Sequence, residues 1–391
     1  MRPAAGELNT AAVQPPLRVL QVTPRYHPYI GGVETHVWEV SRRLAQHGVS
    51  VTVITTDPGG RLPSEEIIDG AAVLRVRAWP ANGDCHFAPG IYRLIRDGPW
   101  DVAHVQSYHT AVAPLAMAAA LCAGIPYVLT FHGGGHSSRL RNALRIVQRM
   151  LLRPQLARAA RLIAVARFEI GLLSRQLRLP PERFVHIPNG SDLPFPPATA
   201  GAAAGTRSSL IASVGRLEQY KGHQRVIAAL PHILSRQPDA RLWIAGAGSY
   251  EPDLRRLAQR LGVAERVEIR AVPPGDREQM AAELLKTGLV VLLSEFETHP
   301  IAVLEAIGLG VPVLVADTSG LSEIAQQGLA RAIPLNSTPE QVAIAVLDQM
   351  RNPLGRGGLH LPAWDDTTDQ LLALYQTVRK HSKKGTRGNP G

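Results

Sequence analysis

Short apolar runs alternate along the chain with stretches of helical periodicity. In the first half, the runs predicted to be strands are LRVLQV (17–22), VSVTVITTD (49–57), DVAHVQ (101–106), PYVLTFH (126–132), RLIAVA (161–166) and FVHIPNG (184–190). Between the first two, VETHVWEVSRRLAQHG (33–48) has helical periodicity and ends at Gly48, a residue typical of helix C-termini. Strand, helix and strand with short links form a βαβ unit, so the sequence predicts a parallel sheet.

A segment rich in Pro, Ala and Gly, residues 191–209, interrupts this alternation and is predicted to be a linker or a long surface loop. The alternation then restarts with the predicted strands LIASVG (210–215), ARLWIAG (240–246), RVEIRAV (266–272), GLVVLLS (288–294) and VPVLVAD (311–317). Near the end, Thr338, Pro339 and Gln341 form a capping-box helix start. The pattern predicts an α/β protein with two doubly wound parallel-sheet domains that face a central cleft.

The same pattern divides the chain into six segments. We expect a disordered leader (1–16), an N-terminal Rossmann-like domain (17–195), a linker (196–208), a C-terminal Rossmann-like domain (209–363), a C-terminal helix that packs back on the N-terminal domain (364–380) and a disordered tail (381–391).

Composition narrows the class of protein. The chain has 391 residues, of which 45% are hydrophobic, which is enough for sizeable cores. Its two cysteines exclude a disulfide framework and a cysteine-rich zinc site, and they fit a reducing cytoplasm. The net charge of +10 favours phosphate-bearing partners. The aromatic content of 5%, with no aromatic residues interleaved among basic ones, argues against a nucleic-acid-binding protein.

Two loops that follow predicted strands carry residue types that bind phosphate. Gly31-Gly32 open the first helix, where glycine permits close backbone approach and free amides attract anions; a plain strand-to-helix turn is the alternative. Arg216 and Lys221 lie five positions apart after the first strand of the second half. Two cations near a helix N-terminus indicate either a bound diphosphate or two solvated surface charges.

The segment SEFETHPIAVLEA (294–306) holds two glutamates in a half-apolar context. Glu297 follows a strand, and Glu305 lies inside the helix whose first turn contains Pro300. Eight helical residues span about 12 Å, which exceeds the about 5–9.5 Å between glycosidase carboxylates and suits an extended ligand held at two places. The free amides at the helix start can hold a phosphate in the middle of such a ligand, as in a nucleotide-sugar. A buried salt bridge and a helix-start carboxylate are the alternatives.

His132 ends a predicted strand and precedes three glycines. Ligands of doubly wound sheets bind beyond the carboxyl ends of the strands, so we expect His132 in the cleft. A lone histidine more often has a structural role, and this position alone does not establish chemistry.

Five motifs, GGVE, TFHGG, IPNGSD, VGRLEQYKG and ETHPIAVLEA, fall in the order and at the spacings of the retaining glycosyltransferases of family 4. The chain resembles that family over about residues 17–380, and the E-x7-E motif together with the G-R-L-x-x-x-K-G loop is more specific than either alone. The resemblance implies the GT-B fold, in which an N-terminal acceptor domain and a C-terminal nucleotide-sugar-binding domain face each other.

The resemblance also implies roles for residues of the C-terminal half. Arg216 and Lys221 would hold the donor diphosphate. Glu305 would bind the ribose hydroxyls, and Glu297, counted among the catalytic residues, would contact hydroxyls of the donor sugar. The further implied donor contacts are Val272, at the nucleobase, and the backbone around Ile301 and Ala302, at the diphosphate.

In the N-terminal half, the resemblance implies that Gly31 and Gly32 let the domain close over the sugar and phosphate. It places His132, the other candidate catalytic residue, beside the transferred sugar and the acceptor. Two stretches depart from the family pattern: Thr298-His299-Pro300 replaces Gly-Phe-Gly, and Ala166-Arg167 stands where the family has serine. The identity of the donor sugar is therefore not implied.

The implied reaction is transfer of a sugar from a nucleotide-sugar, such as a UDP- or GDP-sugar, to an acceptor hydroxyl, a lipid-linked acceptor included. The resemblance implies neither a cofactor nor a metal ion, and a side-chain nucleophile is not needed. A nucleotide-sugar 2-epimerase of related fold and a non-catalytic nucleotide-sugar-binding protein stay open as alternatives. The intact E-x7-E motif with Arg216 and Lys221 argues against the epimerase.

An arginine row marks the segment SRLRNALRIVQRMLLRPQ, residues 138–155. Its members, at four-residue spacing, are Arg141, Arg145, Arg149 and Arg153, and an adjacent apolar stripe holds Leu140, Leu144, Val147 and Leu151. Such a helix suits an anionic membrane surface and would make a cytoplasmic protein peripheral on the inner face of the membrane. The alternative is an ordinary amphipathic helix with a solvated basic face.

Overall fold

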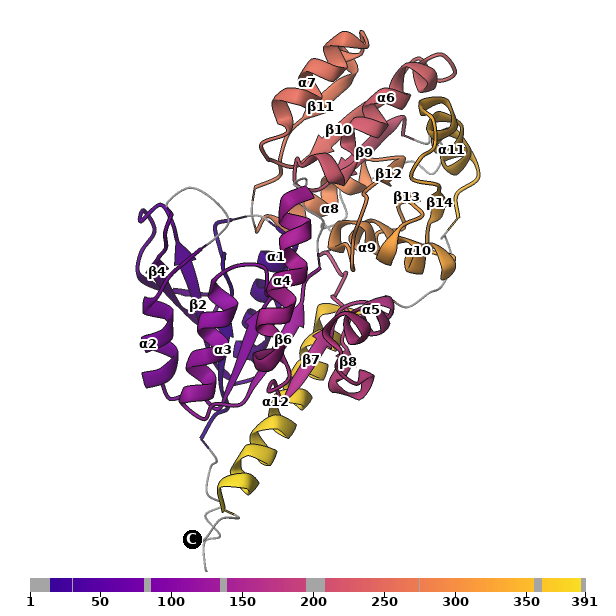
Figure 1. Ribbon diagram of the computed structural model, residues 1–391. Helices are drawn as coiled ribbons and strands as arrows, with labels where there is room; N and C mark the ends of the chain where they lie inside the picture. Colours follow the sequence, from indigo (N-terminus) through magenta and orange to yellow (C-terminus); the bar gives the residue numbers. More distant parts are fainter. Residues whose placement is uncertain are drawn as a thin grey trace, which may run out of the picture.

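Two parallel sheets form the two lobes of the protein (Figure 1). The structure, a computed structural model, describes residues 15–29, 31–80, 86–133, 139–194, 208–273, 275–354 and 361–387, with the side chains of 139–146 and 383–387 left out. None of the helices in these ranges combines the length and apolar character needed to cross a bilayer.

The N-terminal lobe is built on an eight-stranded sheet of order β3-β4-β2-β1-β5-β6-β7-β8, parallel except for the antiparallel pair β3 and β4. Its strands are β1 (Arg18–Val22), β2 (Ser50–Asp57), β3 (Glu65–Ile68), β4 (Ala71–Arg77), β5 (Val102–Gln106), β6 (Tyr127–Phe131), β7 (Arg161–Ala164) and β8 (Phe184–His186). Its helices are α1 (Gly32–Gln46), α2 (Gly90–Asp97), α3 (Val112–Cys122), α4 (Arg139–Leu156) and α5 (Arg167–Leu177).

The C-terminal lobe has a six-stranded parallel sheet of order β11-β10-β9-β12-β13-β14. Its strands are β9 (Leu210–Val214), β10 (Arg241–Ala245), β11 (Val267–Ile269), β12 (Leu289–Leu292), β13 (Val313–Ala316) and β14 (Arg331–Ile333). Its helices are α6 (His223–Leu234), α7 (Glu251–Arg260), α8 (Arg277–Leu285), α9 (Ile301–Gly308), α10 (Ser319–Gln326) and α11 (Pro339–Arg351), and α12 (Trp364–Arg387) follows.

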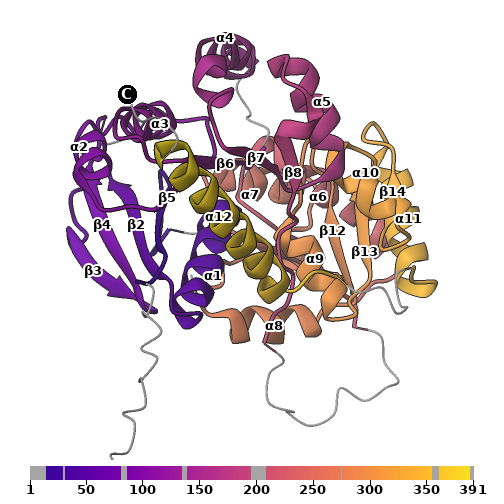
Figure 2. The same cartoon turned by 90° about the horizontal axis from the view of Figure 1, so that it is seen from below.

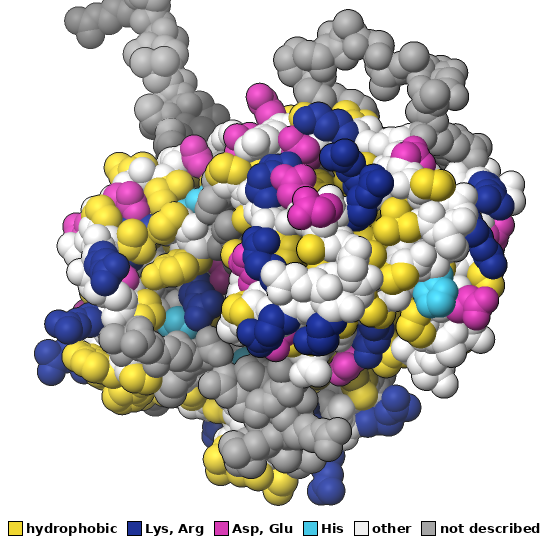
Figure 3. Space-filling view, turned by 90° about the horizontal axis from the view of Figure 1, so that it is seen from above, with side chains coloured by type: hydrophobic (Ala, Val, Ile, Leu, Met, Phe, Trp, Pro, Cys, Tyr) yellow, Lys and Arg dark blue, Asp and Glu magenta, His cyan; other side chains and the backbone are white. Residues whose placement is uncertain are grey.

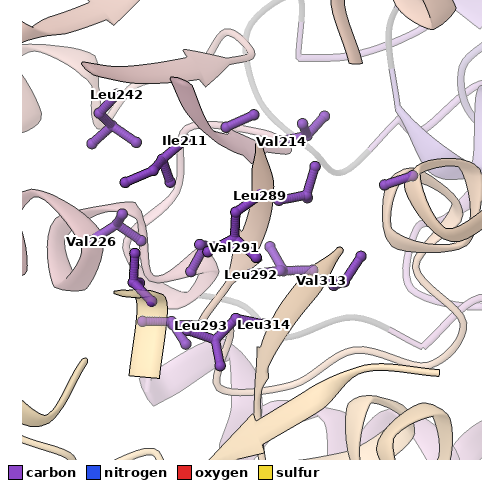
Figure 4. Close-up of a cluster of buried hydrophobic side chains, with 14 of the residues drawn as sticks. Ile211, Val214, Val226, Leu242, Leu289, Val291, Leu292, Leu293, Val313 and Leu314 are labelled. Atoms are coloured by element: carbon purple, nitrogen blue, oxygen red, sulfur yellow. The ribbon is translucent and has the colours of Figure 1, made fainter. Parts of the chain in front are cut away.

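The apolar strands of the C-terminal sheet pack against its helices. Ile211, Leu289 and Leu314 from neighbouring strands and Val226 from α6 are fully buried (Figure 4). Burying an aliphatic side chain of this size contributes about 1.5–3 kcal/mol, so the short β-branched runs that predicted these strands also stabilise them. The predicted capping box at Thr338 is confirmed, since Thr338 Oγ1 accepts from the Gln341 amide at 3.3 Å.

Helix α12 returns from the C-terminal lobe and lies beside α1 (Figure 2). Its Tyr375 hydroxyl accepts from Gln21 Nε2 at 3.2 Å and donates to His104 Nδ1 at 2.6 Å, all in the core of the N-terminal lobe. The chain therefore passes between the lobes twice, and Ser191 N donates to Pro362 O at 3.0 Å where the two passages meet.

The structure differs from the sequence-based expectations at the C-terminal tail and in several elements that were not predicted. The helix predicted to end near residue 380 continues to Arg387, so the prediction of a disordered tail from 381 is wrong for residues 381–387. Basic residues crowd this end of the chain, and cations near a helix C-terminus stabilise the helix dipole. Strands β3, β4 and β14 and helices α2, α8 and α10 were not predicted. The predicted leader and linker fall largely outside the described residues, at 1–14 and 195–207.

Candidate active site

One cavity of about 680 Å³ lies between the two lobes, beyond the carboxyl ends of both sets of strands. Viewed from above, a hollow between the lobes shows basic and histidine side chains (Figure 3). Every residue predicted for the donor or the catalytic step lines this cavity: Gly31, Gly32, His132, Arg216, Lys221, Val272, Glu297, Ile301, Ala302 and Glu305.

The two predicted phosphate-binding cations are paired with protein groups. Lys221 Nζ donates to Glu297 Oε1 at 2.6 Å, and both side chains are largely buried. Burial acts to lower the pKa of Lys221, but the Glu297 carboxylate and neighbouring groups outweigh it and raise this pKa, so the lysine stays charged. Arg216 contacts Glu218 at 2.5 Å and the Tyr220 hydroxyl at 3.0 Å. In this structure, the two cations predicted to bind a diphosphate therefore contact carboxylates and a phenol of the protein itself.

The loop that carries these cations is shaped by Gly222. Its φ of 80° lies in the left-handed region, and a Cβ atom there would lie 2.0 Å from the Leu293 carbonyl oxygen. Only glycine avoids both the strain and the clash. This turn allows Lys221 to end a short 3₁₀ segment and point at Glu297 just before α6 begins.

The two glutamates approach the cavity from different local structures. Helix α9 begins at Ile301, after the cap residue Pro300, so Glu297 lies in the preceding loop and Glu305 lies more than one turn inside the helix. The 12 Å expected from eight helical residues does not apply, because the stretch up to Pro300 is not helical. Ile301 and Ala302, the first residues of α9, line the same cavity as both glutamates, so the free amides of the first helical turn lie at the cavity wall.

Glu305 has a partner that the sequence did not reveal. The guanidinium of Arg277, the first residue of α8, donates to Glu305 Oε1. Burial raises the pKa of the Glu305 carboxyl, and Arg277 opposes that shift. No sequence motif marks Arg277, since it lies 28 positions from Glu305 and on another helix.

The segment Thr298-His299-Pro300, which differs from the glycine-rich pattern of the similar family, joins the two lobes. Thr298 Oγ1 donates to Gly133 O at 3.1 Å, and Asn189 Nδ2 donates to His299 O at 3.0 Å. Asn189 N donates to His299 Nδ1 at 3.3 Å, which leaves the ring proton on Nε2. Burial lowers the pKa of His299 to about 3, so the ring is neutral. A segment that is glycine-rich in the family is here hydrogen-bonded across the cleft.

His132 lies on the N-terminal wall of the cavity as a neutral side chain. Its Nε2 donates to Gln106 Oε1 at 2.7 Å, and Gln106 Nε2 donates to Gln21 Oε1 at 2.8 Å. Burial lowers the pKa of His132 well below its usual value. With Nε2 committed as a donor, Nδ1 is the nitrogen that can accept a hydrogen bond from a ligand hydroxyl.

The second departure, Ala166-Arg167, begins α5 without a capping side chain. Two glutamates accept hydrogen bonds from the backbone amides that a capping side chain would otherwise satisfy. Glu169 accepts from Ala166 N at 3.3 Å, and Glu323 of the C-terminal lobe accepts from Arg167 N and Phe168 N at 3.4 and 3.3 Å. Burial raises the pKa of Glu169 to about 8. The serine position of the family is therefore part of a contact between the lobes.

The predicted membrane arginines do not share the cavity. The side chains of Arg141 and Arg145 fall outside the described residues, and Arg149 is half-buried on α4. Arg153 donates to the carbonyls of Leu177 and Arg178, so it fastens α4 to the end of α5. Among the described residues, no cluster of three or more His, Cys, Asp or Glu side chains is arranged to hold a metal ion.

Comparisons with known families match both lobes. Residues 30–194 match the family described as Glycosyltransferase Family 4, and residues 201–356 match Glycosyl transferases group 1. A D-inositol 3-phosphate glycosyltransferase of Frankia alni is 30% identical over 390 residues, which cover 88% of this chain and 94% of that protein.

Two further similarities extend over most of the chain. A GDP-mannose:cellobiosyl-diphosphopolyprenol alpha-mannosyltransferase of Xanthomonas oryzae is 28% identical and covers 80% of this chain and 81% of its own length. Among solved structures, Anabaena HepE in complex with UDP and glucose superposes with a TM-score of 0.67 at 14% identity, over 95% of this chain and all of that one. The predicted two-domain GT-B fold is confirmed by such neighbours.

Proposed function

The chain belongs to glycosyltransferase family 4, and we propose that its cavity binds a nucleotide-sugar between Glu297 and Glu305 and transfers the sugar with retention of anomeric configuration. As a nucleotide-sugar-dependent glycosyltransferase it acts in glycoconjugate biosynthesis. One observation carries the proposal for the site. Two carboxylates flank the N-terminus of α9 in the same cavity as Arg216 and Lys221, which matches a ligand with hydroxyls at both ends and diphosphate in the middle.

The roles of the lining residues follow from their positions. Lys221 and Arg216 exchange their carboxylate and phenol partners for the diphosphate, and the first amides of α9, around Ile301 and Ala302, complete the anion site. Glu305 accepts from the ribose, and Glu297 accepts from hydroxyls of the sugar. In this arrangement the donor lies on the C-terminal lobe, residues 209–363, and residues 17–195 receive the acceptor.

The N-terminal wall and the nucleobase pocket complete the donor site. Gly31 and Gly32 bring the start of α1 to the cavity, and Ile301 lies 3.9 Å from the position a Cβ atom on Gly32 would take. Buried Val272 lies against the nucleobase. His132 offers Nδ1 to a hydroxyl of the sugar or the acceptor.

The proposed transfer needs no side-chain nucleophile. The bond between the anomeric carbon and the diphosphate oxygen breaks while the acceptor oxygen bonds to the same face of that carbon. The leaving diphosphate takes the acceptor's proton, and Arg216 and Lys221 stabilise the negative charge that it gains.

A panel of UDP-, GDP- and ADP-sugars tests the function. We expect at least one to raise the melting temperature, to be hydrolysed slowly and to give a product of unchanged anomeric configuration. A product epimerised at C2 with release of nucleotide would indicate a 2-epimerase. Stabilisation without any turnover on lipid or soluble acceptors would indicate a binding protein. Absence of any interaction across the panel would refute the proposal.

We further propose that the acceptor is lipid-linked and that α4 rests on the inner face of the membrane, at the cytoplasmic side. Val147, Met150 and Leu151 are 52%, 70% and 73% exposed on α4, beside the arginine row. Figure 2 shows α4 standing at the outer edge of the molecule, where a flat surface can reach it. Apolar side chains flanked by arginines on one helix suit an anionic bilayer surface. The named polyprenol-linked substrate of the Xanthomonas relative supports this acceptor class.

We expect the protein to sediment with vesicles of phosphatidylglycerol and phosphatidylcholine at 0.15 M salt, and less with phosphatidylcholine alone. Each arginine near the surface contributes about 1 kcal/mol, so Arg149→Gln should weaken vesicle binding about fivefold. Replacing Arg141, Arg145 and Arg149 together should leave the protein in the supernatant, with the affinity for nucleoside diphosphate intact.

The matched control removes the same charge from the other lobe. Arg255, Arg256 and Arg260 lie exposed on α7, and their replacement by glutamine should leave vesicle binding unchanged. Wild-type protein that stays in the supernatant with anionic vesicles, or equal loss in both triple variants, would rule out docking through α4 and favour a soluble acceptor.

A further inference from the structure

Arg277 stands at the junction of the two lobes and of the cavity. It begins α8, whose cap residue Asp276 accepts from Gln279 N at 2.9 Å. The Arg277 side chain is 15% exposed and lines the cavity. Its guanidinium donates to Glu305 Oε1 on α9, and its Nε lies 3.4 Å from Glu39 Oε1 on α1 of the other lobe. One side chain thus contacts a carboxylate from each lobe.

Glu39 is already held by cations of its own helix. Its Oε2 accepts from Arg42 Nε at 2.7 Å and from Arg43. Arg43 in turn contacts Asp192 and Asp365, which belong to the two chain passages between the lobes. Arg277 Nε forms no hydrogen bond within the described part of the chain, so its contact with Glu39 is electrostatic. The directed hydrogen bond of Arg277 therefore goes to Glu305.

The surroundings of Glu305, apart from Arg277, disfavour its negative charge. Burial is the largest influence and raises the pKa of the Glu305 carboxyl, and the facing carboxylates of Glu39 and Asp192 raise it further. Arg277 lowers this pKa through its charge and its hydrogen bond. A buried carboxyl without a cation takes up a proton, because an isolated charge is unfavourable away from water.

The hydrogen bond also decides which oxygen meets the ligand. Arg277 takes Oε1 of Glu305, which leaves Oε2 for a ligand on the cavity side. An ionised carboxylate accepts hydrogen bonds at both oxygens, whereas a protonated one has an O–H that must donate. A ribose hydroxyl donates most favourably to the ionised form.

We propose that Arg277 is the positioning residue that prepares Glu305 to accept hydrogen bonds from the nucleotide ribose. The proposal rests on the ribose contact proposed for Glu305. It assigns to Arg277 an effect on nucleotide binding that depends on pH, because Arg277 acts through the protonation state of another side chain. Direct contact with the nucleotide would give an effect independent of pH.

The test measures binding of UDP, GDP and ADP by calorimetry between pH 7 and 9, above the phosphate pKa of about 6. In Arg277→Gln the pKa of Glu305 rises, so affinity is lost as pH falls through that higher value. We expect binding at pH 7 to be about tenfold weaker than in the wild type and to recover toward the wild-type affinity at pH 9. Arg277→Lys retains the charge and should restore much of the affinity at pH 7.

Glu39→Gln is the matched control, since it removes the other carboxylate that Arg277 contacts. Glu39 raises the pKa of Glu305, so its removal should not shift the binding profile to higher pH. Weaker binding of Arg277→Gln by the same factor at every pH, or an upward shift in Glu39→Gln as well, would overturn the proposal.

Two further outcomes concern the underlying ribose contact. If wild-type protein binds none of UDP, GDP and ADP, the proposed function is wrong and so is the role of Arg277. If wild-type protein binds and Glu305→Gln binds equally well, the ribose assignment is wrong while the donor site stands. If Arg277→Gln loses nucleotide affinity in a pH-dependent way and Glu305→Gln also loses nucleotide affinity, the ribose contact of Glu305 and the positioning role of Arg277 are both supported.

Discussion

Replacing Lys221 with alanine is expected to lower turnover of the nucleotide-sugar by about 10²–10³-fold, the usual cost of removing one preorganised charge stabiliser from an active site. Lys221 is largely buried, holds its charge and lies in the donor cavity. Affinity for the nucleoside diphosphate alone should fall roughly ten- to a hundredfold, since hydrogen bonds to charged groups contribute about 1.5–3 kcal/mol. Steady-state kinetics and calorimetry measure the two effects.

A second variant separates two causes of that loss. Lys221→Ala leaves Glu297 as a buried carboxylate without its cation, and this alone is costly. In the double variant Lys221→Ala, Glu297→Gln the unpaired charge is gone. If nucleotide affinity returns, Lys221 acts by balancing Glu297; if it stays low, Lys221 binds phosphate, as we propose. Lys286→Ala removes an exposed lysine paired with Glu283 and should change neither quantity.

The overall fold was predictable because its signals are local. Apolar runs such as residues 288–294 are buried on both faces in a parallel sheet, and they identify a strand without knowledge of its neighbours. Strands β3 and β4 were not predicted because they form a hairpin at the edge of the sheet, where one face of each strand is less buried than the other and no continuous apolar run results. The alternation in AAVLRVR, residues 71–77, was the signal that would have revealed β4.

The candidate site was predictable wherever a residue stands directly after a strand. Arg216 and Glu297 reach the cavity for that reason, since all strand ends of a doubly wound sheet meet at one edge. The residues that pair with them in the structure could not be predicted in this way. Glu297 pairs with Lys221, 76 positions away, and this contact depends on the approach of two loops. Sequence spacing reports neither that approach nor the charge balance that results from it.

Arg277 and Asn189 were missed for the same physical reason. Arg277 contacts residues from α9 and α1, and Asn189 contacts His299, 110 positions away, across the cleft. The contact between Arg277 and Glu39 and the contact between Asn189 and His299 arise only when the lobes pack together, and the contact between Arg277 and Glu305 arises only when α8 packs beside α9. The departure of Thr298-His299-Pro300 from the glycine-rich pattern was the one available signal that this loop has partners of its own.

The two glutamates are expected to differ in what they contribute, and the structure sharpens the contrast. Glu305→Gln should weaken binding of UDP or GDP about tenfold or more, because it removes a charge-assisted hydrogen bond to the ribose. Glu297→Gln releases Lys221 from its ion pair, so the affinity for the free nucleotide should be unchanged or higher.

For Glu297 we expect replacement to lower turnover rather than nucleotide affinity. Its Oε1 accepts from Ser294 Oγ at 2.8 Å, and this contact stays when Lys221 turns to the diphosphate, so the carboxylate presents a positioned acceptor to the sugar. Glu297→Gln keeps the shape but loses the charge that orients those hydroxyls, and misplacement of the reacting carbon by about 1 Å costs roughly hundredfold in rate. We therefore expect kcat to fall by about that factor while nucleotide affinity holds. Equal losses of free-nucleotide affinity in Glu297→Gln and Glu305→Gln would contradict the division of roles, since a glutamate that meets only the sugar has no contact with a nucleotide that lacks one.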